Sequence, residues 1–460
     1  MTNSLHQNQE NKDVVRRIDH AKIKDKKTAF MGGVYDSQDH YSRPIPKNID
    51  VSNFSPLSLD ELLEILGLTI KQDQQNKLVT FLCQLSAYTE DSQFNISFNA
   101  PSSTGKSFIP LEIAQLFPKE DVIKTGYASP TAFFHDQGEY KEELKGYEID
   151  LERKILIFLD QPHDLLLQHL RPLLSHDEKE ILIKITDKSQ THGLRTKNIL
   201  LRGFSSVIFC TAGLKIDEQE ATRMVLLSPE INQEKIREAI YAKVKKESDR
   251  KTYKDWLQGN AGRELLKERI MAIKQERIEE IIIKSPEKIE EIFTKQKRIL
   301  KPRDARDVGR LISLVKTFAL LNLWFRERNG QTIIANEDDI SEAIKIWNKI
   351  SESQELGIPP YIYSLYLKIV LTAFNEKNQI QDEESEQNIQ GIGLTRQEII
   401  SKHFQVYGRA LSDWKLRQEI IPMWESAGLI TQERDIDDKR KILISPTTPF
   451  TVSQEQNNSE

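Results

Sequence analysis

The chain has few cysteines and no long apolar run. Cys83 and Cys210 are its two cysteines, each inside an apolar stretch, so a disulfide framework and a cysteine zinc cluster are excluded and both thiols are expected to be buried and inert. The N-terminus MTNSLHQNQENKDVV lacks the apolar segment of a signal peptide, and no stretch of about 18 apolar residues occurs. We therefore expect a cytoplasmic protein without membrane contact.

A strong net charge of either sign is also missing. The 65 Lys and Arg residues nearly balance the 70 Asp and Glu residues, which leaves a formal net charge of −5. Contact with nucleic acid would therefore need local basic patches, because no overall positive field exists. The chain is 38% hydrophobic and 29% charged, a composition typical of a folded protein with polar ends.

A length of 460 residues predicts two to four domains. Shifts in composition and periodicity suggest these boundaries: an unstructured leader over 1–56, an α/β core over 57–230, a helical region over 231–356, a helix-and-ribbon domain over 357–446 with an acidic linker at 376–392, and a disordered tail over 447–460.

Short apolar segments alternate with helical patterns in the expected core. FNISF, DVIKTG, KILIFLD and SSVIFCTA are typical of buried strands, and helices are expected between them. Ser58 and Glu61 form a capping-box pattern at the start of an earlier helix. The alternation predicts an α/β fold with a parallel sheet covered on both faces. Beyond Pro229 the pattern is almost wholly helical to about Ser351.

The stretch NAPSSTGKSF follows the first predicted strand and resembles the phosphate-binding pattern G-x-x-x-x-G-K-[ST], with Ala100 at the first glycine. Such a loop aims backbone N–H groups and a helix N-terminus at a polyphosphate. Lys106 would reach the β and γ oxygens of ATP, and Ser107 would hold Mg²⁺. The predicted nucleotide-binding residues are Ala100, Pro101, Ser102, Ser103, Thr104, Gly105, Lys106 and Ser107.

A carboxylate at the end of another apolar strand completes this chemistry. Asp160 ends ILIFLD and is the candidate second residue at the Mg²⁺ ion. The next residue, where hydrolytic ATPases usually carry Glu, is Gln161, whose amide can orient a water but cannot accept its proton. Asp164, Asp177 and Glu178 are alternative bases that the sequence leaves open.

In order and spacing these motifs resemble the AAA+ ATPases, and among them the minichromosome-maintenance (MCM) type of replicative helicase. The resemblance covers about residues 58–350 and the C-terminal winged helix-turn-helix. It implies a P-loop AAA+ core with a helical lid, ring assembly into a hexamer, and action on DNA. Ala100, Gln161, Thr211 and the lack of a large N-terminal DNA-collaring domain depart from the family pattern.

The resemblance also implies three further catalytic residues. Thr211 stands at the first sensor, where an Asn often occurs, Arg223 matches the arginine finger, and Arg303 matches the second sensor. A structural alternative stays open for both arginines. Arg223 could pair with a nearby acid such as Glu220, and Arg303 with Asp304 or Asp307.

Two basic segments are candidate DNA contacts. The resemblance implies a hairpin at LIKITDKSQTHGLRTKNILLRGF that touches DNA, although a solvated hairpin is the alternative. Helices followed by a basic ribbon predict the winged helix, where DNA contact and protein docking are both open. We expect Trp414 and Trp424 to pack in its core. The predicted contacts are Lys184, Lys188, His192, Arg195, Lys197, Lys415, Arg417, Lys439 and Arg440.

The first hypothesis is an ATP-driven DNA-translocating motor, an MCM-like helicase that takes part in the replication of a chromosome or mobile element. The second is an AAA+ initiator or helicase-loader switch that binds DNA and hydrolyses ATP slowly, which Gln161 and the missing N-terminal collar favour. A third, a DNA-binding regulator with a vestigial ATPase, fits poorly with an intact Gly105-Lys106-Ser107 and Asp160. Partners of the first two would include DNA and a loader, primase or other replication protein.

Overall fold

The structure is a computed structural model. It describes residues 49–126, 138–160, 164–187, 195–213, 221–295, 297, 299–384, 393–435 and 438–447. Cys83 and Cys210 are both buried, as their apolar surroundings in the sequence predicted. The chain divides into two units, Met1–Pro44 and Ile45–Glu460. The first unit lies outside the described residues, and all the elements named in the following paragraphs belong to the second.

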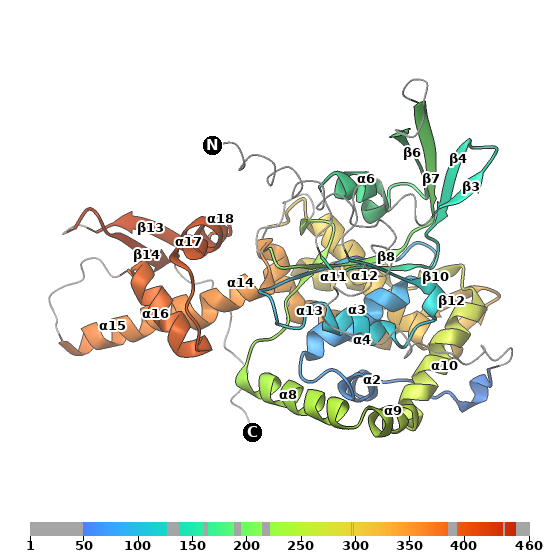
Figure 1. Cartoon of the computed structure of the whole chain (residues 1–460), viewed down its shortest axis with the longest axis horizontal. Coiled ribbons are helices and arrows are strands. Elements are labelled where there is room, and N and C mark those ends of the chain that lie inside the picture. Colours follow the sequence, from blue (N-terminus) through green and yellow to red (C-terminus); the bar gives the residue numbers. More distant parts are fainter. Residues whose placement is uncertain are drawn as a thin grey trace, which may run out of the picture. The chain divides into compact units, whose positions relative to one another are not determined.

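A five-stranded parallel sheet forms the centre of the fold (Figure 1). The sequence predicted the parallel sheet and four of its strands, but not β9. Its order is β2-β5-β8-β1-β9, and every pair within it is parallel. The strands are β1 (Ile96–Asn99), β2 (Val122–Thr125), β5 (Ile155–Phe158), β8 (Ser206–Thr211) and β9 (Val225–Leu227).

Four of these strands (β1, β5, β8 and β9) are buried along their whole length, which explains why they are mainly apolar. The edge strand β2 is half-buried and exposes Lys124. In β5, Ile155 and Ile157 pack into one core with the surrounding helices, whereas Leu156 and Phe158 pack into a second core with α6. The covering helices are α2 (Leu59–Gly67), α3 (Gln74–Ser86), α4 (Phe108–Ala114) and α6 (Asp164–Ser175). The predicted capping box of Ser58 and Glu61 opens α2.

A second sheet combines two hairpins. Its order is β3-β4-β7-β6, and β4 runs parallel to β7 while the other pairs are antiparallel. The two hairpins therefore stand side by side (Figure 1). The strands are β3 (Glu139–Lys141), β4 (Gly146–Asp150), β6 (Glu180–Asp187) and β7 (Arg195–Arg202).

The region expected to be almost wholly helical contains a third sheet, so that expectation was wrong in part. The predicted helix through ELLKERIMAIKQERIEEIIIK stops at Glu276, because Arg277 adopts a left-handed conformation (φ 47°). β10 (Glu280–Ile283) then pairs parallel with β12 (Thr332–Ala335), which pairs with β11 (Glu327–Asn329). The helices here are α8 (Gln233–Ser248), α9 (Arg250–Gln258), α10 (Ala261–Glu276), α11 (Pro286–Lys295), α12 (Asp304–Leu321) and α13 (Glu337–Leu356).

The C-terminal part has its own core and the element order expected of a winged helix. An isolated bridge joins Leu394 to Ile444 in the terminal hairpin. The elements are α14 (Pro360–Leu365), a π-helical turn η5 (Tyr366–Leu371), α15 (Thr372–Glu384), α16 (Arg396–Tyr407), α17 (Asp413–Lys415), a π-helical turn η6 (Leu416–Ile420), α18 (Ile421–Ser426), β13 (Ile430–Arg434) and β14 (Ile442–Pro446). Short 3-10 turns occupy Val51–Asn53, Lys119–Asp121 and Leu323–Phe325.

The two tryptophans of this part differ from each other. Trp424 is buried and its indole N–H donates to the carbonyl of Ile362 at 3.0 Å, as core packing predicts. Trp414, on the short α17, is 66% exposed, so the expectation that it packs in the core was wrong. The ten-residue spacing was read on one continuous helix, but the π-helical turn η6 between the two residues alters that register.

Within the described residues, no single helix is long and apolar enough to cross a membrane. The helices Glu337–Leu356 and Pro360–Gln379 meet that criterion when taken together, and they are bent by 85° at the break between them.

Gly146 lies where the two hairpins pair, and its lack of a Cβ allows β4 to approach β7 closely. A Cβ at this position would lie 2.0 Å from the carbonyl oxygen of Asn198 on β7, so Gly146→Ala must push β4 away from its partner. We expect a loss of at least about 2 kcal/mol in the free energy of unfolding. In the control Gly309→Ala, on α12, the new Cβ meets no atom within 4 Å. That variant should be up to about 1 kcal/mol more stable than the wild type in urea unfolding.

Candidate nucleotide and nucleic-acid sites

The predicted phosphate-binding loop connects β1 to α4. Its backbone turns through two left-handed residues, Ser103 (φ 65°) and Gly105 (φ 98°), before α4 begins at Phe108. Ala100 is fully buried, so its methyl group is accommodated at the start of the turn, where the pattern has glycine. The loop therefore has the strand-turn-helix context that the motif requires.

Lys106 folds back across the loop. Its Nζ donates to the carbonyl of Pro101 at 3.0 Å. Burial lowers the pKa of Lys106, while the nearby Cys210 and Asp160 act in the opposite direction. The neighbouring Ser107 hydroxyl contacts the Cys210 thiol, whose pKa burial raises to about 12. Lys106 is thus a partly desolvated cation, and an ammonium with few water contacts forms strong hydrogen bonds to an anionic oxygen.

The parallel sheet brings three predicted site elements to one edge. β8 lies between β1 and β5, with Asn99 opposite Thr211 and Phe158 opposite Phe209. The loop after β1, Asp160 after β5 and Thr211 at the end of β8 therefore lie at the carboxyl ends of neighbouring strands. Asp160 is exposed, and the hydroxyl of buried Thr211 accepts from the Gly213 N–H at 3.0 Å. Gln161 lies outside the described residues.

Lys235 is a residue of this site that sequence reasoning missed. It stands in the first turn of α8, and its Nζ lies 3.4 Å from the carbonyl oxygen of Thr104 in the loop. The same ammonium forms an ion pair with buried Asp73 and donates to the carbonyl of Glu230 at 2.9 Å. No motif connects position 235 with the loop, because the contact arises from tertiary packing.

Arg223 and Arg303 lie together at the other edge of the sheet. Arg223 precedes β9, whose first residue Val225 donates to the carbonyl of Asn95 just before β1. Its Nε donates to the Ser175 hydroxyl at 2.7 Å. Arg303, at the start of α12, reaches the carbonyl of Ala221 at 3.4 Å. The structure therefore brings these two arginines to each other's neighbourhood and to the edge opposite the loop.

Three arginines near the start of α12 (Arg303, Arg306 and Arg310) form hydrogen bonds to residues 221–222, just before Arg223. Asp307 accepts from Arg303 at 3.2 Å and from buried Arg310, so the predicted structural pairing of Arg303 with Asp307 is present. Arg306 donates to the Thr222 hydroxyl, and Arg310 to the Thr222 carbonyl. Burial lowers the pKa of Arg310 to about 10. α12 thereby holds the residues next to Arg223.

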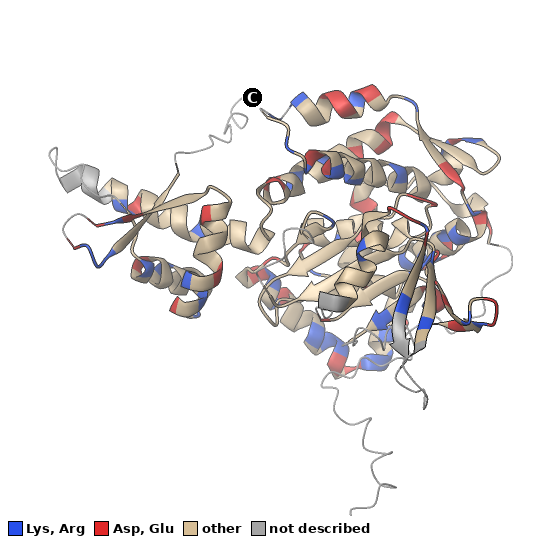
Figure 2. Ribbon diagram, turned by 90° about the horizontal axis from the view of Figure 1, so that it is seen from above, with Lys and Arg blue, Asp and Glu red and all other residues tan. Residues whose placement is uncertain are grey.

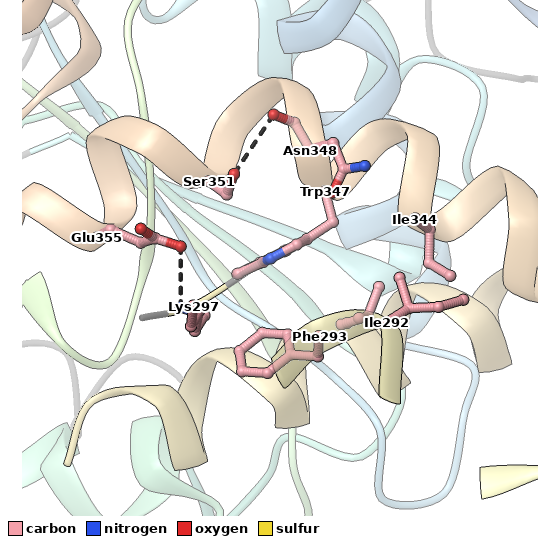
Figure 3. A pocket seen from close by; sticks show the side chains of 9 residues that line it. Ile292, Phe293, Lys297, Ile344, Trp347, Asn348, Ser351 and Glu355 are labelled. Carbon is pink, nitrogen blue, oxygen red and sulfur yellow. Dashed lines mark hydrogen bonds and ion pairs between the residues drawn. The ribbon is translucent and has the colours of Figure 1, made fainter. Parts of the chain in front are cut away.

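A small pocket lies beside this arginine cluster (Figure 3). It lies between α11, α12 and α13, and none of its lining residues belongs to the loop. Lys297 on its wall donates to Asp304 at 2.6 Å and to Glu355 at 2.9 Å. Burial lowers the pKa of Lys297, but these hydrogen bonds outweigh it and raise the pKa. The pair with Asp304 fixes the first turn of α12, next to Arg303.

The predicted cations of the hairpin are divided between two faces of its sheet. Lys184 pairs in register with Asn198, so Lys197 projects from the other face. Arg195 is the first residue of β7, and Lys188 and His192 lie outside the described residues. β7 (RTKNILLR) carries basic residues and no acid, whereas β6 (EILIKITD) carries one Lys and two acids; blue bands mark basic residues on these strands in Figure 2.

Two tyrosines that sequence reasoning did not single out, Tyr147 and Tyr140, lie near Lys197. Its Nζ lies 4.5 Å above the centre of the Tyr147 ring. Tyr140, opposite Tyr147 on β3, meets that ring edge-on at 5.6 Å and is 57% exposed. An exposed aromatic ring beside a cation suits stacking on a nucleic-acid base next to a phosphate contact.

The predicted cations of the C-terminal part are spread over helix and hairpin. Arg417 is exposed on η6, and Lys439 and Arg440 are exposed before β14, where Arg440 pairs with Asp438 at 3.1 Å. Lys415, on α17, contributes to lowering the pKa of Lys106, although less than burial does.

Ser107 and Asp160 are the two residues that fit a magnesium ion carried by a nucleotide, since both stand at the loop edge and both offer oxygen. Among the residues that the structure describes, no group of three or more His, Cys, Asp or Glu could hold a metal by itself. A metal here would therefore depend on the phosphates for most of its ligands.

His176 follows Ser175, which is the last residue of α6 and the partner of Arg223. Burial lowers its pKa to about 4, although Asp177 and Asp91 act against this. Between pH 6.5 and 4 the unfolded chain therefore takes up a proton that the folded chain does not. We expect the free energy of unfolding to fall by up to about 3 kcal/mol across that range. His176→Asn, which tolerates the left-handed backbone (φ 55°), should flatten this slope in pH-dependent urea unfolding.

Comparisons with known proteins find similarity to solved structures. No protein family matches the sequence, and no curated protein matches it. Among solved structures, a full-length MCM homolog from Methanopyrus kandleri is similar at 12% identity and a TM-score of 0.40. The match covers 64% of this chain and 59% of that protein, so the chain spans less than two thirds of its length. A similarity of this size does not assign an activity.

Proposed function

We propose that this chain is an ATP-hydrolysing motor of the AAA+ class that moves along DNA, an MCM-like helicase acting in replication. The observation that carries the proposal is the sheet edge where the phosphate-binding loop, Asp160 and Thr211 meet. The basic strand β7 (RTKNILLR) of the hairpin sheet supplies the second requirement, a surface for the DNA backbone.

ATP would bind with its phosphates over the loop. The backbone N–H groups that lead into α4 and the Lys106 ammonium would hold the β and γ oxygens. Lys106 would exchange its hydrogen bond to Pro101 for one to phosphate. Ser107 and Asp160 would hold Mg²⁺, which neutralises charge that develops on the phosphates.

Hydrolysis would need a second copy of the chain. Arg223 and Arg303 occupy the sheet edge opposite the loop. Arginines at that edge would therefore serve the nucleotide of a neighbour, which makes turnover depend on assembly into a ring, a hexamer in the family that the motifs resemble. In that role Arg223 would give up its hydrogen bond to the Ser175 hydroxyl and donate to a phosphate oxygen of the neighbour's nucleotide.

DNA would run along the hairpin sheet. Lys184, Lys188, His192, Arg195 and Lys197 would contact phosphates without reading bases. Tyr140 would stack on a base, which a backbone-tracking motor can use without sequence preference. In the C-terminal part, Lys415, Arg417, Lys439 and Arg440 would form a second contact in a winged helix-turn-helix.

The alternative is a switch that binds ATP, assembles on DNA and hydrolyses slowly, as an initiator or helicase loader would. Gln161 at the position of the usual catalytic Glu favours it, because an amide cannot take a proton from water. The motor requires fast turnover coupled to strand separation, so kinetics separate the two functions.

We expect ATP turnover that single-stranded DNA stimulates, together with strand displacement on a forked duplex. Lys106→Ala should lower turnover at least about 100-fold, because the loop loses its charged contact to the transferred phosphate. A coupled ATPase assay and a gel-based unwinding assay measure both activities.

The matched control is Lys349→Ala, an exposed lysine on α13, which should behave like the wild type. Stimulated turnover without unwinding would support the switch and exclude the helicase. Turnover that survives Lys106→Ala would show that the loop is not the nucleotide site.

Tyr140→Ala should weaken binding to single-stranded oligothymidine by roughly 5- to 100-fold, because one base loses its stacking partner. Tyr140→Phe keeps the ring and should bind like the wild type. Fluorescence anisotropy at constant salt measures both affinities.

An abasic oligonucleotide of the same length tests the mechanism, since it carries phosphates without bases. Tyr140→Ala should bind it as the wild type does, and the control Phe325→Ala should bind both oligonucleotides normally. Equal weakening of both oligonucleotides by Tyr140→Ala would contradict stacking and would indicate a distorted hairpin.

A further inference from the structure

The helix α8 has an inverted arrangement of polar and apolar residues. Its inward contacts are polar: Lys235 pairs with Asp73, and Lys246 lies 3.9 Å from buried Glu112 on α4. Between them, Glu238 accepts from the Gln72 side chain at 3.3 Å. Positions 235, 238 and 246 share one side of a helix with 3.6 residues per turn. This side, which normally carries the apolar residues of a surface helix, is attached to the domain by charged groups.

The outward side of α8 carries the apolar residues instead. All sixteen residues of the helix are described, and none of them is buried. The exposed fractions are 43% for Ile236, 59% for Ile240, 70% for Tyr241 and 57% for Val244. These four residues, called the α8 stripe below, lie opposite the polar contacts. A continuous apolar stripe that faces away from its own domain marks a surface that another molecule covers.

The α8 stripe borders the candidate nucleotide site. Lys235 precedes Ile236, the first residue of the stripe, and its Nζ contacts the loop at Thr104. Any molecule that approaches the loop from outside therefore meets the N-terminal half of α8 as well. The arginine that completes the proposed ATPase must make that approach, because Arg223 and Arg303 lie at the opposite edge of their own sheet.

The arginine edge carries an exposed apolar pair of its own. Ile299 and Leu300 are 73% and 60% exposed, and they precede Arg303 by four and three residues. The Lys297 ion pairs with Asp304 and Glu355 hold this turn against the start of α12. The apolar pair and Arg303 therefore form one surface with a fixed spacing.

The charges beside the two apolar surfaces are opposite in sign. Glu230 and Glu234 are exposed just before the α8 stripe, whereas Lys301 and Arg306 are exposed beside Ile299 and Leu300. This complementarity favours contact between the arginine edge and the loop end of α8. The C-terminal half of α8 is basic (Lys243, Lys245, Lys246) and lies away from the loop.

We propose that the α8 stripe of one copy binds Ile299 and Leu300 of a second copy. This contact rests on the proposed function, and it deepens that function by assigning the residues that bring an arginine edge to a loop edge. The two surfaces differ, so the interface is head to tail, and repetition of the contact closes a ring or extends a filament. An open oligomer then keeps one free edge of each kind, at its two ends, until it closes.

Two variants that block different edges test this geometry. Ile240→Glu places a charge in the α8 stripe, and Leu300→Glu places one in the arginine edge. In the presence of Mg²⁺ and a non-hydrolysable ATP analogue, each variant alone should be monomeric in sedimentation velocity, whereas the wild type assembles. An equimolar mixture should form a dimer and nothing larger, because it keeps one intact edge of each kind.

The control Phe404→Glu changes a residue of similar exposure (57%) on α16 and should assemble like the wild type. Thermal melting by circular dichroism checks that all variants are folded. Assembly of Ile240→Glu alone, a mixture that stays monomeric, or a wild type that stays monomeric would each overturn the proposed contact. Binding of DNA or of an acidic protein by the stripe, in place of a second copy, would give the last of these results.

Turnover in the mixture separates this inference from the proposed function. The Leu300→Glu copy supplies the loop, and the Ile240→Glu copy supplies the arginine edge. Arg223→Ala should lower turnover at least about tenfold more when the Ile240→Glu copy carries it than when the other copy does. A mixed dimer without ATP turnover would support the interface and contradict the ATPase.

Discussion

The parallel direction of β1, β5, β8 and β9 is the constraint on which the sites of this protein depend. Parallel strands present all their carboxyl ends at one edge and all their amino ends at the other. The loop after β1, Asp160 after β5 and Thr211 at the end of β8 therefore share an edge. Arg223, which precedes β9, stands at the opposite edge for the same reason.

This separation connects the chemistry to assembly. A cation at one edge and a phosphate loop at the other cannot complete a single site unless two copies meet, so the proposed ATPase and the proposed interface have the same origin. α12 reinforces the arrangement, since Arg306 and Arg310 grip Thr222 next to Arg223 while Lys297 secures the start of the helix. The α8 stripe extends the loop edge and gives a second copy an apolar surface to bury.

The hairpin sheet would add the proposed nucleic-acid contact to the same domain. β4 and β7 pair across Gly146, where the absence of a Cβ permits close approach to Asn198. That pairing brings Tyr147 under Lys197 and leaves Tyr140 exposed. A surface that combines cations with an aromatic ring is suited to a single strand. The hairpins would then be the part of the domain that transfers nucleotide-driven movement to DNA.

The sequence by itself determined the elements whose signals are local. Apolar runs predicted four of the five strands of the parallel sheet, Ser58 and Glu61 predicted a helix start, and Gly105-Lys106-Ser107 after a strand predicted the loop. Signals of this kind act within a few residues, so they are readable along the chain. The three-stranded sheet around β10 was missed because its partners are about fifty residues apart, and Trp414 was misplaced because a π-helical turn shifts the helix register. Only the tertiary structure decided that Lys235 reaches the loop, that Arg303 joins Arg223, that Tyr140 accompanies Lys197, and that α8 turns its apolar side outward. Those contacts join residues distant in the sequence, and the packing of whole elements sets them.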